Sequence, residues 1–348
     1  KRPEFAAAAG GVAKLPLARS LASSLSVLRT RQNAEGGFGM WNAADEADEF
    51  ASVYAAHMLL EAKEHGENVP ADMLQKAMAY VRTLAASSSA TLPGLRVRAY
   101  AAYLLTRQMN VTTPMLTATR ESLDKLFPKV WQSDPAAAYL AAAYQMQKQE
   151  RLASDLVDRQ VARLVQHPAR GKGGDEALYY VDPLVEDAQT LYILSRHFPA
   201  RAKALPPEAM TAMVKGLAEN RYNTLSAAYL TLAFDAYANA VGQEAAGKLG
   251  IMEIDAQGNK KPLTLPNNLI PRVPFTASAN KLRFSNDSSL NAYYAVTETG
   301  FDRQVPTAEL KNGMEVLREF VDAAGKPVTS VTVGDEVTVR LKFRAVGR

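Results

Sequence analysis

Cysteine is absent from the 348 residues of this chain. The absence excludes disulfide bonds, a zinc site with thiolate ligands and a cysteine nucleophile within these residues. It leaves the cellular compartment open, because a chain without cysteine folds equally well in reducing and in oxidising surroundings.

Histidine is scarce, and long apolar runs are missing. None of the four histidines lies in an HExxH motif or next to a Ser–Asp pair, so we interpret them as core or helix-capping residues. No apolar stretch approaches the ~20 residues that cross a bilayer. The opening KRPEFAAAAGGVAKLP has too short an apolar run for a signal peptide, and we expect it to be a loop cut from a longer chain.

Charge is not concentrated in any part of the sequence. The formal net charge is +4, from 40 basic and 36 acidic residues, and the basic residues are scattered. Nucleic acid requires a concentrated basic face, so we expect no nucleic-acid partner. With 47% hydrophobic and 22% charged residues, the composition is that of a folded protein with a sizeable core.

Helical periodicity fills most of the chain up to residue 241. Ala, Leu, Tyr and Met recur at spacings of three and four residues, and the breaks fall at Gly, Pro and Asn. Proline beside a carboxylate marks helix starts at Asp134-Pro135 and Asp182-Pro183, and glycine marks helix ends at Gly66 and Gly242. The pattern predicts ten helices, near residues 16–32, 46–65, 71–86, 94–109, 114–127, 135–149, 152–166, 184–198, 207–220 and 224–241.

The predicted helices are of two kinds that alternate along the chain. Segments such as FASVYAAHMLL (50–60) carry small and aromatic residues on nearly every face, which is typical of helices buried on both sides. Helices between them, such as ADMLQKAMAYVRTL (71–84), are amphipathic. Tyrosines mark the first kind at steps of 46, 44, 48 and 37 residues: Tyr54, Tyr100, Tyr144, Tyr192 and Tyr229.

A repeat of one buried and one surface helix is a helical-hairpin array. A closed ring, the α/α toroid, buries one helix of every pair, and the small residues let the inner helices crowd together. An open solenoid is the competing interpretation. Ten helices make five pairs, so a ring of six pairs would lack one, and we expect the first pair to be truncated.

Alternating patterns replace helical ones after residue 241. They predict antiparallel strands joined in hairpins within 249–265, 281–285, 290–299, 313–331 and 335–346. Turns are expected at residues 255–259, 322–325 and 334–335. We therefore divide this mostly α chain into a toroid over residues 1–242, a β segment over 243–300 and an incomplete β-sandwich over 301–348.

Acidic residues after the GGFGMW turn (36–41) raise the question of a catalytic acid. Asp45, Glu46, Asp48 and Glu49 stand at a helix start, where negative charge complements the exposed N–H groups and the helix dipole. A general acid in the cavity of an α/α-barrel glycosidase is the sharper interpretation. No carboxylate pairs with this cluster at a known spacing, so we favour capping.

Other charged positions are interpreted in the same way. Glu186 and Asp187 are expected to cap a helix, and Arg96 and Arg98 are expected to be solvated rather than to hold an acidic ligand. The stretch GKGGDEALYY (171–180) lacks a phosphate-binding pattern and is expected to be a loop at the toroid rim. We predict no catalytic residue, no metal site and no cofactor in this chain.

Several stretches resemble a known family. RTRQNAEGGFGMW (29–41), followed by FASVYAAHMLLEA (50–62), is similar to an element of α/α toroids that terpene cyclases, protein prenyltransferases and the thioester domains of complement and α2-macroglobulin proteins share. LRFSNDSSLNAYYAVTETGF (282–301) and MEVLREFVDAAGKPVTSVTVGDEVTVRLKFRA (314–345) then resemble bacterial α2-macroglobulin. The resemblance covers nearly the whole chain and implies a thioester-type toroid, a CUB-like β domain and a C-terminal macroglobulin-type sandwich.

The thioester motif of that family, Cys-x-Glu-Gln, is absent from these residues. The resemblance places it upstream of Lys1, unless this branch has lost the thioester. AASSSATLPG (85–94), comparable to a turn that carries a catalytic histidine in complement proteins, has no histidine.

Phe38, Met40 and Trp41 are apolar side chains in a turn, where they require a cover. In relatives with a thioester, apolar residues shield the acyl bond from water. The resemblance therefore makes these three residues a candidate apolar seam at the toroid face that meets the β domains. The alternative is that they fill the end of the barrel.

The resemblance implies a part of a periplasmic, broad-range protease inhibitor that is not an enzyme. In this family a protease cuts a bait segment elsewhere in the chain, and the domains then rearrange and enclose the protease. The expected partners are target proteases and the remaining macroglobulin domains of the same chain, with any membrane tether outside this segment. The alternative is a toroid enzyme acting on polysaccharide or isoprenoid, with a β accessory domain.

Overall fold

The structure is a computed structural model that describes residues 17–166, 182–218, 222–241, 249–266, 272–287, 292, 294–298 and 314–345. It contains two compact units, Lys1–Tyr294 and Ala295–Arg348. The expected helix end at Gly242, the Gly-rich stretch 171–180 and His167 lie outside the described residues. Within the described ranges, no helix combines the length and the apolarity that a membrane span requires.

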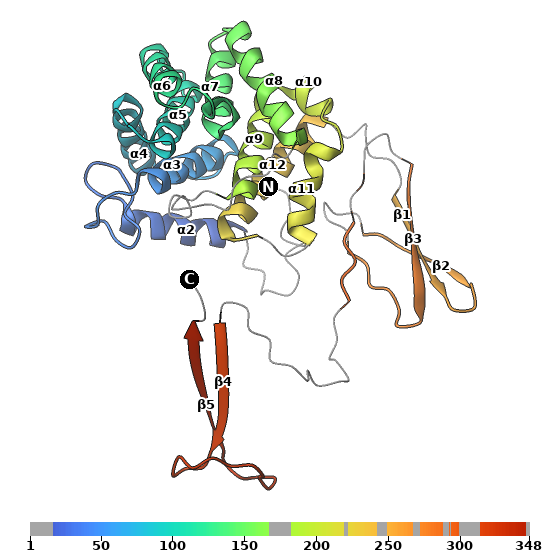
Figure 1. Cartoon of the computed structure of the whole chain (residues 1–348). Helices are drawn as coiled ribbons and strands as arrows, with labels where there is room; N and C mark the ends of the chain where they lie inside the picture. Colours follow the sequence, from blue (N-terminus) through green and yellow to red (C-terminus); the bar gives the residue numbers. More distant parts are fainter. Residues whose placement is uncertain are drawn as a thin grey trace. The chain divides into compact units, whose positions relative to one another are not determined.

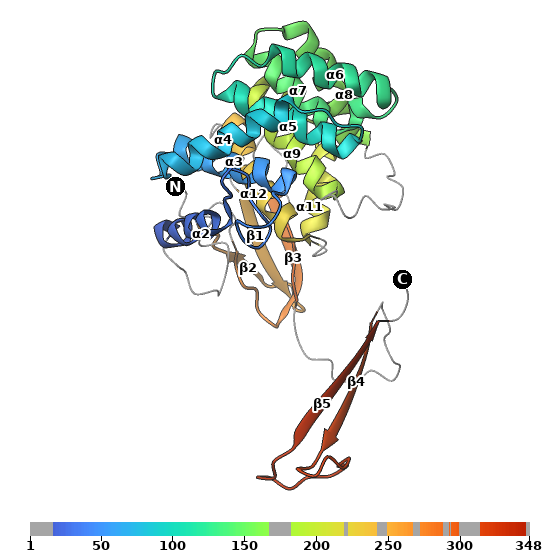
Figure 2. The ribbon, with the colours of Figure 1, turned by 90° about the vertical axis from the view of Figure 1, so that its left-hand side faces the viewer.

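Helical hairpins form the first part of unit Lys1–Tyr294 (Figures 1 and 2). The inner helices are α3 (Glu49–Glu64), α5 (Leu92–Arg107), α7 (Pro135–Met146), α9 (Pro183–His197) and α12 (Thr224–Val241). The outer helices are α2 (Leu17–Arg31), α4 (Ala71–Ala86), α6 (Thr113–Leu126), α8 (Glu150–Gln166) and α11 (Glu208–Ala218). Two short helices were not predicted, η1 (Trp131–Ser133) and α10 (Pro199–Lys203).

The inner helices close into a ring. Each packs on the next one in the order α3, α5, α7, α9, α12. Tyr54 of α3 meets Tyr229 of α12, with 5.2 Å between ring centroids, so the first and last inner helices also touch. The α/α toroid is confirmed, and the open solenoid is wrong.

Burial follows the two helix kinds that the sequence predicts. Every residue of α7 from Pro135 to Tyr144 is buried, because neighbours pack on all its sides. Helix α4 instead buries one stripe at spacings of three and four residues, as an amphipathic helix does: Met73, Leu74, Ala77, Val81, Leu84 and Ala85.

Side-chain caps fix where the inner helices begin. Asp48 accepts a hydrogen bond from the Ala51 amide at 2.7 Å, and Asp182 accepts one from the Leu184 amide at 2.8 Å. Each bond satisfies one of the N–H groups that a first helical turn leaves open. Capping by Asp48 is therefore confirmed, whereas Asp182 rather than Glu186 or Asp187 caps α9.

A repeated left-handed residue ends three inner helices. It is Gly66 after α3, Met109 after α5 and Lys148 after α7, with φ of 76°, 58° and 60°. After α5, the amide of Asn110 donates to the carbonyl of Leu105 at 3.1 Å, which is the long bond of a Schellman motif. The predicted stop at Gly66 is confirmed, and the other two stops use residues that disfavour this conformation.

A three-stranded antiparallel sheet follows the helices. It consists of β1 (Leu249–Asp255), β2 (Lys260–Leu263) and β3 (Ala279–Asn286), in the order β2-β1-β3. The predicted turn at residues 255–259 is confirmed, because Asp255 Oδ1 accepts hydrogen bonds from the amides of Gln257 and Asn259 at 2.9 and 2.8 Å. The strand predicted over 290–299 is wrong for the residues described there, 292 and 294–298, which lie in no strand.

The second unit is an antiparallel hairpin of β4 (Met314–Val321) and β5 (Thr338–Ala345). Strand β4 ends at the predicted turn over residues 322–325, whereas β5 is shorter than predicted because a turn occupies its start. Asp322 accepts bonds from the amides of Ala324 and Lys326 at 2.9 Å, and Gly325 has φ of 79°. At the second predicted turn, Asp335 accepts from the Thr332 amide at 2.7 Å.

Candidate functional site

Tyrosine side chains from the five inner helices fill the hub of the ring. Tyr54, Tyr100, Tyr192 and Tyr229 take part, as the repeat predicts, but the residue from α7 is Tyr139 rather than Tyr144. Tyr139 stacks on Tyr100 with 4.4 Å between centroids.

Tyr144 lies on another side of α7. Five residues turn a helix by about 140° beyond a full turn, so Tyr144 points away from the hub and lies beside Arg120 of α6. Tyr144 therefore marks α7 as a buried helix, as the repeat predicts, but it is not the residue of α7 that enters the hub.

His57 is at the centre of a hydrogen-bond network across the hub. Its Nδ1 lies 2.6 Å from the Tyr100 hydroxyl, and its Nε2 lies 3.1 Å from the Tyr192 hydroxyl and 3.2 Å from Glu61 Oε1. The imidazole is 2% exposed. His57 is a core histidine, as predicted, but it connects α3, α5 and α9 rather than only filling space.

Glu61 lies at the end of this network and forms ion pairs with two arginines. Arg107 Nη2 lies 2.9 Å and Arg196 Nη1 lies 3.3 Å from Glu61 Oε1, and the Tyr192 hydroxyl donates to the same oxygen. Glu64 pairs with the same two arginines, at 2.7 Å from Arg107. The cluster therefore ties α3 to α5 and α9 by ion pairs.

Burial and charge set the protonation states in the hub. Burial alone would raise the pKa of the Glu61 carboxyl, but hydrogen bonding to His57 and the charges of His57 and Arg107 hold this pKa far below its usual value. Burial lowers the pKa of His57, and burial with the charges of Arg196 and Arg107 lowers the pKa of His197 to about 3. At neutral pH the hub holds neutral imidazoles, a carboxylate and protonated phenols, whose pKa burial raises, as at Tyr139.

This hub has no room for a substrate. Tyr100, Tyr103, Tyr139, Tyr192 and Tyr229 are each at most 2% exposed. A glycosidase or isoprenoid site would require an open cavity lined by carboxylates. Among the described residues, no three His, Asp or Glu side chains gather as metal ligands would. The network is suited to fixing helices in one register.

Arginine–carboxylate pairs fix neighbouring hairpins at the end of the ring where the inner helices begin. Arg96 Nε donates to Asp134 Oδ1 at 2.9 Å, and Arg96 also lies 3.4 Å from Glu186. Arg98 Nη2 donates to Glu49 Oε1 at 3.0 Å. The expectation that Arg96 and Arg98 are solvated is wrong, because each has a carboxylate of a neighbouring hairpin within reach.

Another such pair links α8 to α9. Arg163 Nη1 lies 2.6 Å from Asp187 Oδ1, and both residues are buried. Glu186 lies in the first turn of α9, as expected for a carboxylate at a helix start, but Asp182 provides the cap, and Glu186 and Asp187 pair with arginines from neighbouring helices. Sequence reasoning missed these pairs because the partners are 24 to 90 residues apart.

The GGFGMW turn is held against α4. Gln32 Nε2 donates to the Met73 carbonyl at 2.9 Å. Gly36 has φ of 94°, and a side chain there would meet the Lys76 carbonyl oxygen at 2.1 Å, so only glycine fits. Asp45 accepts hydrogen bonds from the amides of Trp41 and Asn42 at 3.1 and 3.0 Å.

The three apolar residues of this turn lie in different surroundings. Phe38 is 2% exposed and belongs to the core, whereas Met40 is 40% and Trp41 is 80% exposed. Phe38 thus fills the barrel end, as one interpretation expects, and Trp41 presents an indole to the outside of this unit. A tryptophan this exposed is typical of a surface that contacts another protein part.

A closed ring of helical hairpins with a filled hub, followed by antiparallel β-structure, defines an α/α-toroid protein with β modules. No family model matches the chain. The alpha-2-macroglobulin homolog of Yersinia pestis is 38% identical over 332 residues, which cover 93% of this chain and 16% of that protein.

Solved structures show the same fold. Native alpha-2-macroglobulin from Escherichia coli, spanning domain MG7 to the C-terminus, matches with a TM-score of 0.60 at 16% identity, and the match covers 98% of this chain and 52% of that one. Escherichia coli alpha-2-macroglobulin activated by porcine elastase matches with a TM-score of 0.50 at 19% identity, over 94% of this chain and 28% of that one. The chain is a homologue of the bacterial alpha-2-macroglobulins, and it spans about one sixth of the length of the Yersinia relative.

Proposed function

We propose that this chain is part of a broad-range protease inhibitor that traps a protease after the protease has cut a bait segment elsewhere in the protein. The observation that carries the proposal is the 38% identity to an alpha-2-macroglobulin homolog over 93% of the chain. The match to a macroglobulin activated by elastase supports proteases as the partners.

The toroid would act in this trap as a rigid body. Ion pairs connect adjacent hairpins at both ends of the ring, at Arg98–Glu49 and at Arg107–Glu61. Buried hydrogen-bonded networks favour one packing arrangement over others. When the bait is cut, the toroid would have to move as a unit. Stiffness favours this movement, because a toroid whose inner helices repacked would not move as a rigid body.

The chain supplies no chemistry of its own in this proposal. Hub side chains with shifted pKa values are normally candidates for catalysis, but here they pack against one another and exclude solvent. Any covalent capture would use a thioester placed upstream of Lys1, whose motif is not among these residues.

Met40 and Trp41 form the exposed part of the candidate seam, with Phe38 as its buried base. In the intact protein we propose that a β module covers this surface and keeps water from the toroid end. We place the protein in the periplasm, where foreign proteases would meet it, with its other macroglobulin domains as further partners.

The test is a trapping assay on the full-length protein that contains this chain. The protein is mixed with elastase, and residual activity is measured on a protein substrate and on a small chromogenic peptide. A trap blocks cleavage of the protein substrate and leaves peptide cleavage largely intact, because the enclosed enzyme still admits small molecules. Equal inhibition of both substrates, or inhibition of neither, would rule the proposal out. Methylamine treatment beforehand separates the covalent from the non-covalent case.

A further inference from the structure

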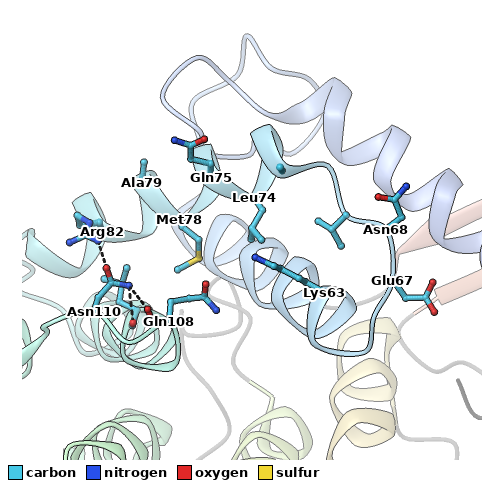
Figure 3. Close-up of a pocket in the computed structure, with 13 residues that line it drawn as sticks. Lys63, Glu67, Asn68, Leu74, Gln75, Met78, Ala79, Arg82, Gln108 and Asn110 are labelled. Carbon is cyan, nitrogen blue, oxygen red and sulfur yellow. Dashed lines mark hydrogen bonds between the residues drawn. The ribbon is translucent and has the colours of Figure 1, made fainter.

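A groove with a volume of about 610 Å³ lies between α4 and the C-terminal ends of α3 and α5. Figure 3 shows the residues that line it. Its floor is apolar, with Leu74 and Leu105 buried and Val69 and Met78 half-buried. This volume is that of a ligand-binding cleft, and neither the hub network nor the seam uses the groove.

One wall of the groove is a fixed polar network. The Arg82 guanidinium donates to Asn110 Oδ1, as the dashed lines of Figure 3 show. Asn110 Nδ2 in turn donates to the carbonyls of Leu105 and Gln108, at 3.1 and 3.3 Å. The Asn110 amide thus holds the Arg82 guanidinium beside the end of α5, and this hydrogen bond restricts the conformations of the arginine side chain.

Four further polar side chains of the groove have unused hydrogen-bonding capacity. Among the residues that the structure describes, no polar partner is found for the side chains of Lys63, Asn68, Gln75 and Gln108. Figure 3 shows Lys63 reaching toward the middle of the groove, while Glu67 points away at the end far from Arg82. The groove therefore offers three primary amides and two cations above an apolar floor.

These groups match an extended peptide with acidic side chains. Primary amides both donate and accept, as a peptide backbone requires. An apolar side chain fits the floor, where flexible Met78 adapts to its shape. The ammonium of Lys63 and the guanidinium of Arg82 favour carboxylates. The groove lining contains no aromatic ring, and this disfavours a sugar, which would stack on one.

We propose that this groove holds an extended acidic peptide segment from another part of the same, longer protein. The segment places an apolar side chain on the floor between Leu74 and Met78 and a carboxylate on Lys63. The Yersinia relative extends far beyond the matched 16% of its length, so a related full-length protein supplies many such segments. A tethered segment needs only weak intrinsic affinity, because its effective concentration is in the millimolar range. The inference rests on the homology and on this geometry, and it does not require protease trapping.

The first experiment titrates the chain with the capped peptide acetyl-Asp-Leu-Asp-amide and follows amide chemical shifts by NMR. We expect binding with a dissociation constant on the order of 1 mM, with the largest shifts at Leu74, Met78 and Gln108. The variant Lys63→Gln should weaken binding about fivefold, the size of one exposed ion pair. Lys63 is exposed, so the variant should fold. Lys76→Gln is the matched control, an exposed lysine on α4 that does not line the groove.

Several outcomes would overturn the peptide site. They are no shifts at about 5 mM peptide, equal binding by the Lys63→Gln variant, or equal binding of acetyl-Asn-Leu-Asn-amide. A loss of affinity in both lysine variants would also overturn it, because the effect would then follow net charge rather than the groove.

The second experiment tests where the segment comes from. A benzophenone amino acid replaces Gln75 in the full-length protein, and cross-linked peptides are identified by mass spectrometry after irradiation. We expect a cross-link within one polypeptide to a segment that contains Asp or Glu and lies outside these 348 residues. Cross-links confined to residues that flank the groove would show that no such segment docks there. A full-length protein that fails to trap elastase but gives the expected cross-link would refute the proposed function alone.

Discussion

Replacing Glu61 by glutamine removes the negative charge on which Arg107, Arg196 and His57 converge. Glutamine keeps the size of the side chain and can still accept a hydrogen bond from the Tyr192 hydroxyl. The perturbation is therefore electrostatic. It leaves two guanidinium groups facing each other with Glu64 as their shared carboxylate.

The size of the effect follows from burial. Arg107 and Glu61 side chains are 3% and 13% exposed, and removal of one partner from such a buried pair costs about 3–5 kcal/mol. Arg196 and Glu64 are about one third exposed, at 30% and 32%, so solvent screens their pair to about 1 kcal/mol. Because the amide preserves some hydrogen bonding, we expect Glu61→Gln to lower the free energy of unfolding by about 3 kcal/mol.

The assay is urea unfolding followed by far-ultraviolet circular dichroism, whose signal is dominated by the toroid helices. With a slope of about 3 kcal/mol/M, the midpoint should fall by about 1 M. Glu121→Gln is the control, an exposed carboxylate on α6 that should shift stability by less than about 0.5 kcal/mol. A double variant with Arg107→Met should lose less than the sum of the single losses, because both residues belong to one network.

The reasoning would be refuted if Glu61→Gln and Glu121→Gln unfolded at the same urea concentration. That result would mean that solvent reaches the cluster in spite of its burial. Additive losses in the double variant would refute the network more narrowly, since they would show that Glu61 and Arg107 act independently.

Three further predictions concern the helix ends, the histidines and the seam. Met109→Gly and Lys148→Gly should each raise the free energy of unfolding by a few tenths up to about 1 kcal/mol, because glycine tolerates the left-handed φ found there; lower urea midpoints would contradict this. The free energy of unfolding should fall as the pH drops from 6.5 towards 3, because the unfolded chain binds a proton at His197 that the folded chain excludes. His197 alone should contribute about 1.4 kcal/mol per pH unit, and His57 acts in the same direction. In the His197→Asn variant, the free energy of unfolding measured with urea should depend less steeply on pH. Trp41→Ser should change the free energy of unfolding of this chain by less than about 0.5 kcal/mol. If a β module covers the seam in the full-length protein, the same variant should increase the fraction of that protein that rearranges without a protease, as measured on native gels.

Local signals in the sequence predicted the helices well. The predicted span 71–86 coincides with α4, and 224–241 coincides with α12, because amphipathic spacing, proline starts and glycine stops act within a few residues. Strand limits were less accurate at 335–346, where Asp335 anchors a turn and β5 starts only at Thr338. The alternation of apolar and polar residues alone does not show where a turn ends and a strand begins.

The hub could be predicted only in outline. Tyrosine enrichment on alternate helices indicated aromatic side chains at the axis, but choosing Tyr139 over Tyr144 depends on the rotation of α7, which its neighbours set. The pairing of Glu61 with Arg107 and Arg196 joins residues 46 and 135 positions apart. Nothing in one sequence distinguishes such carboxylates from solvated ones, because the partner is known only once the ring is closed.

The meeting of Tyr54 with Tyr229 also bears on how the molecule is made. The first and last inner helices touch, so a ribosome or a secretion channel must release nearly the entire helical region before the hub can be completed. Until then His57 and its tyrosines face water in a half-built arc, which a protease or an aggregating neighbour can attack. Binding of chaperones to the chain should therefore decline steeply once residue 241 has emerged. A shortened chain that ends before α12 should remain bound to chaperones.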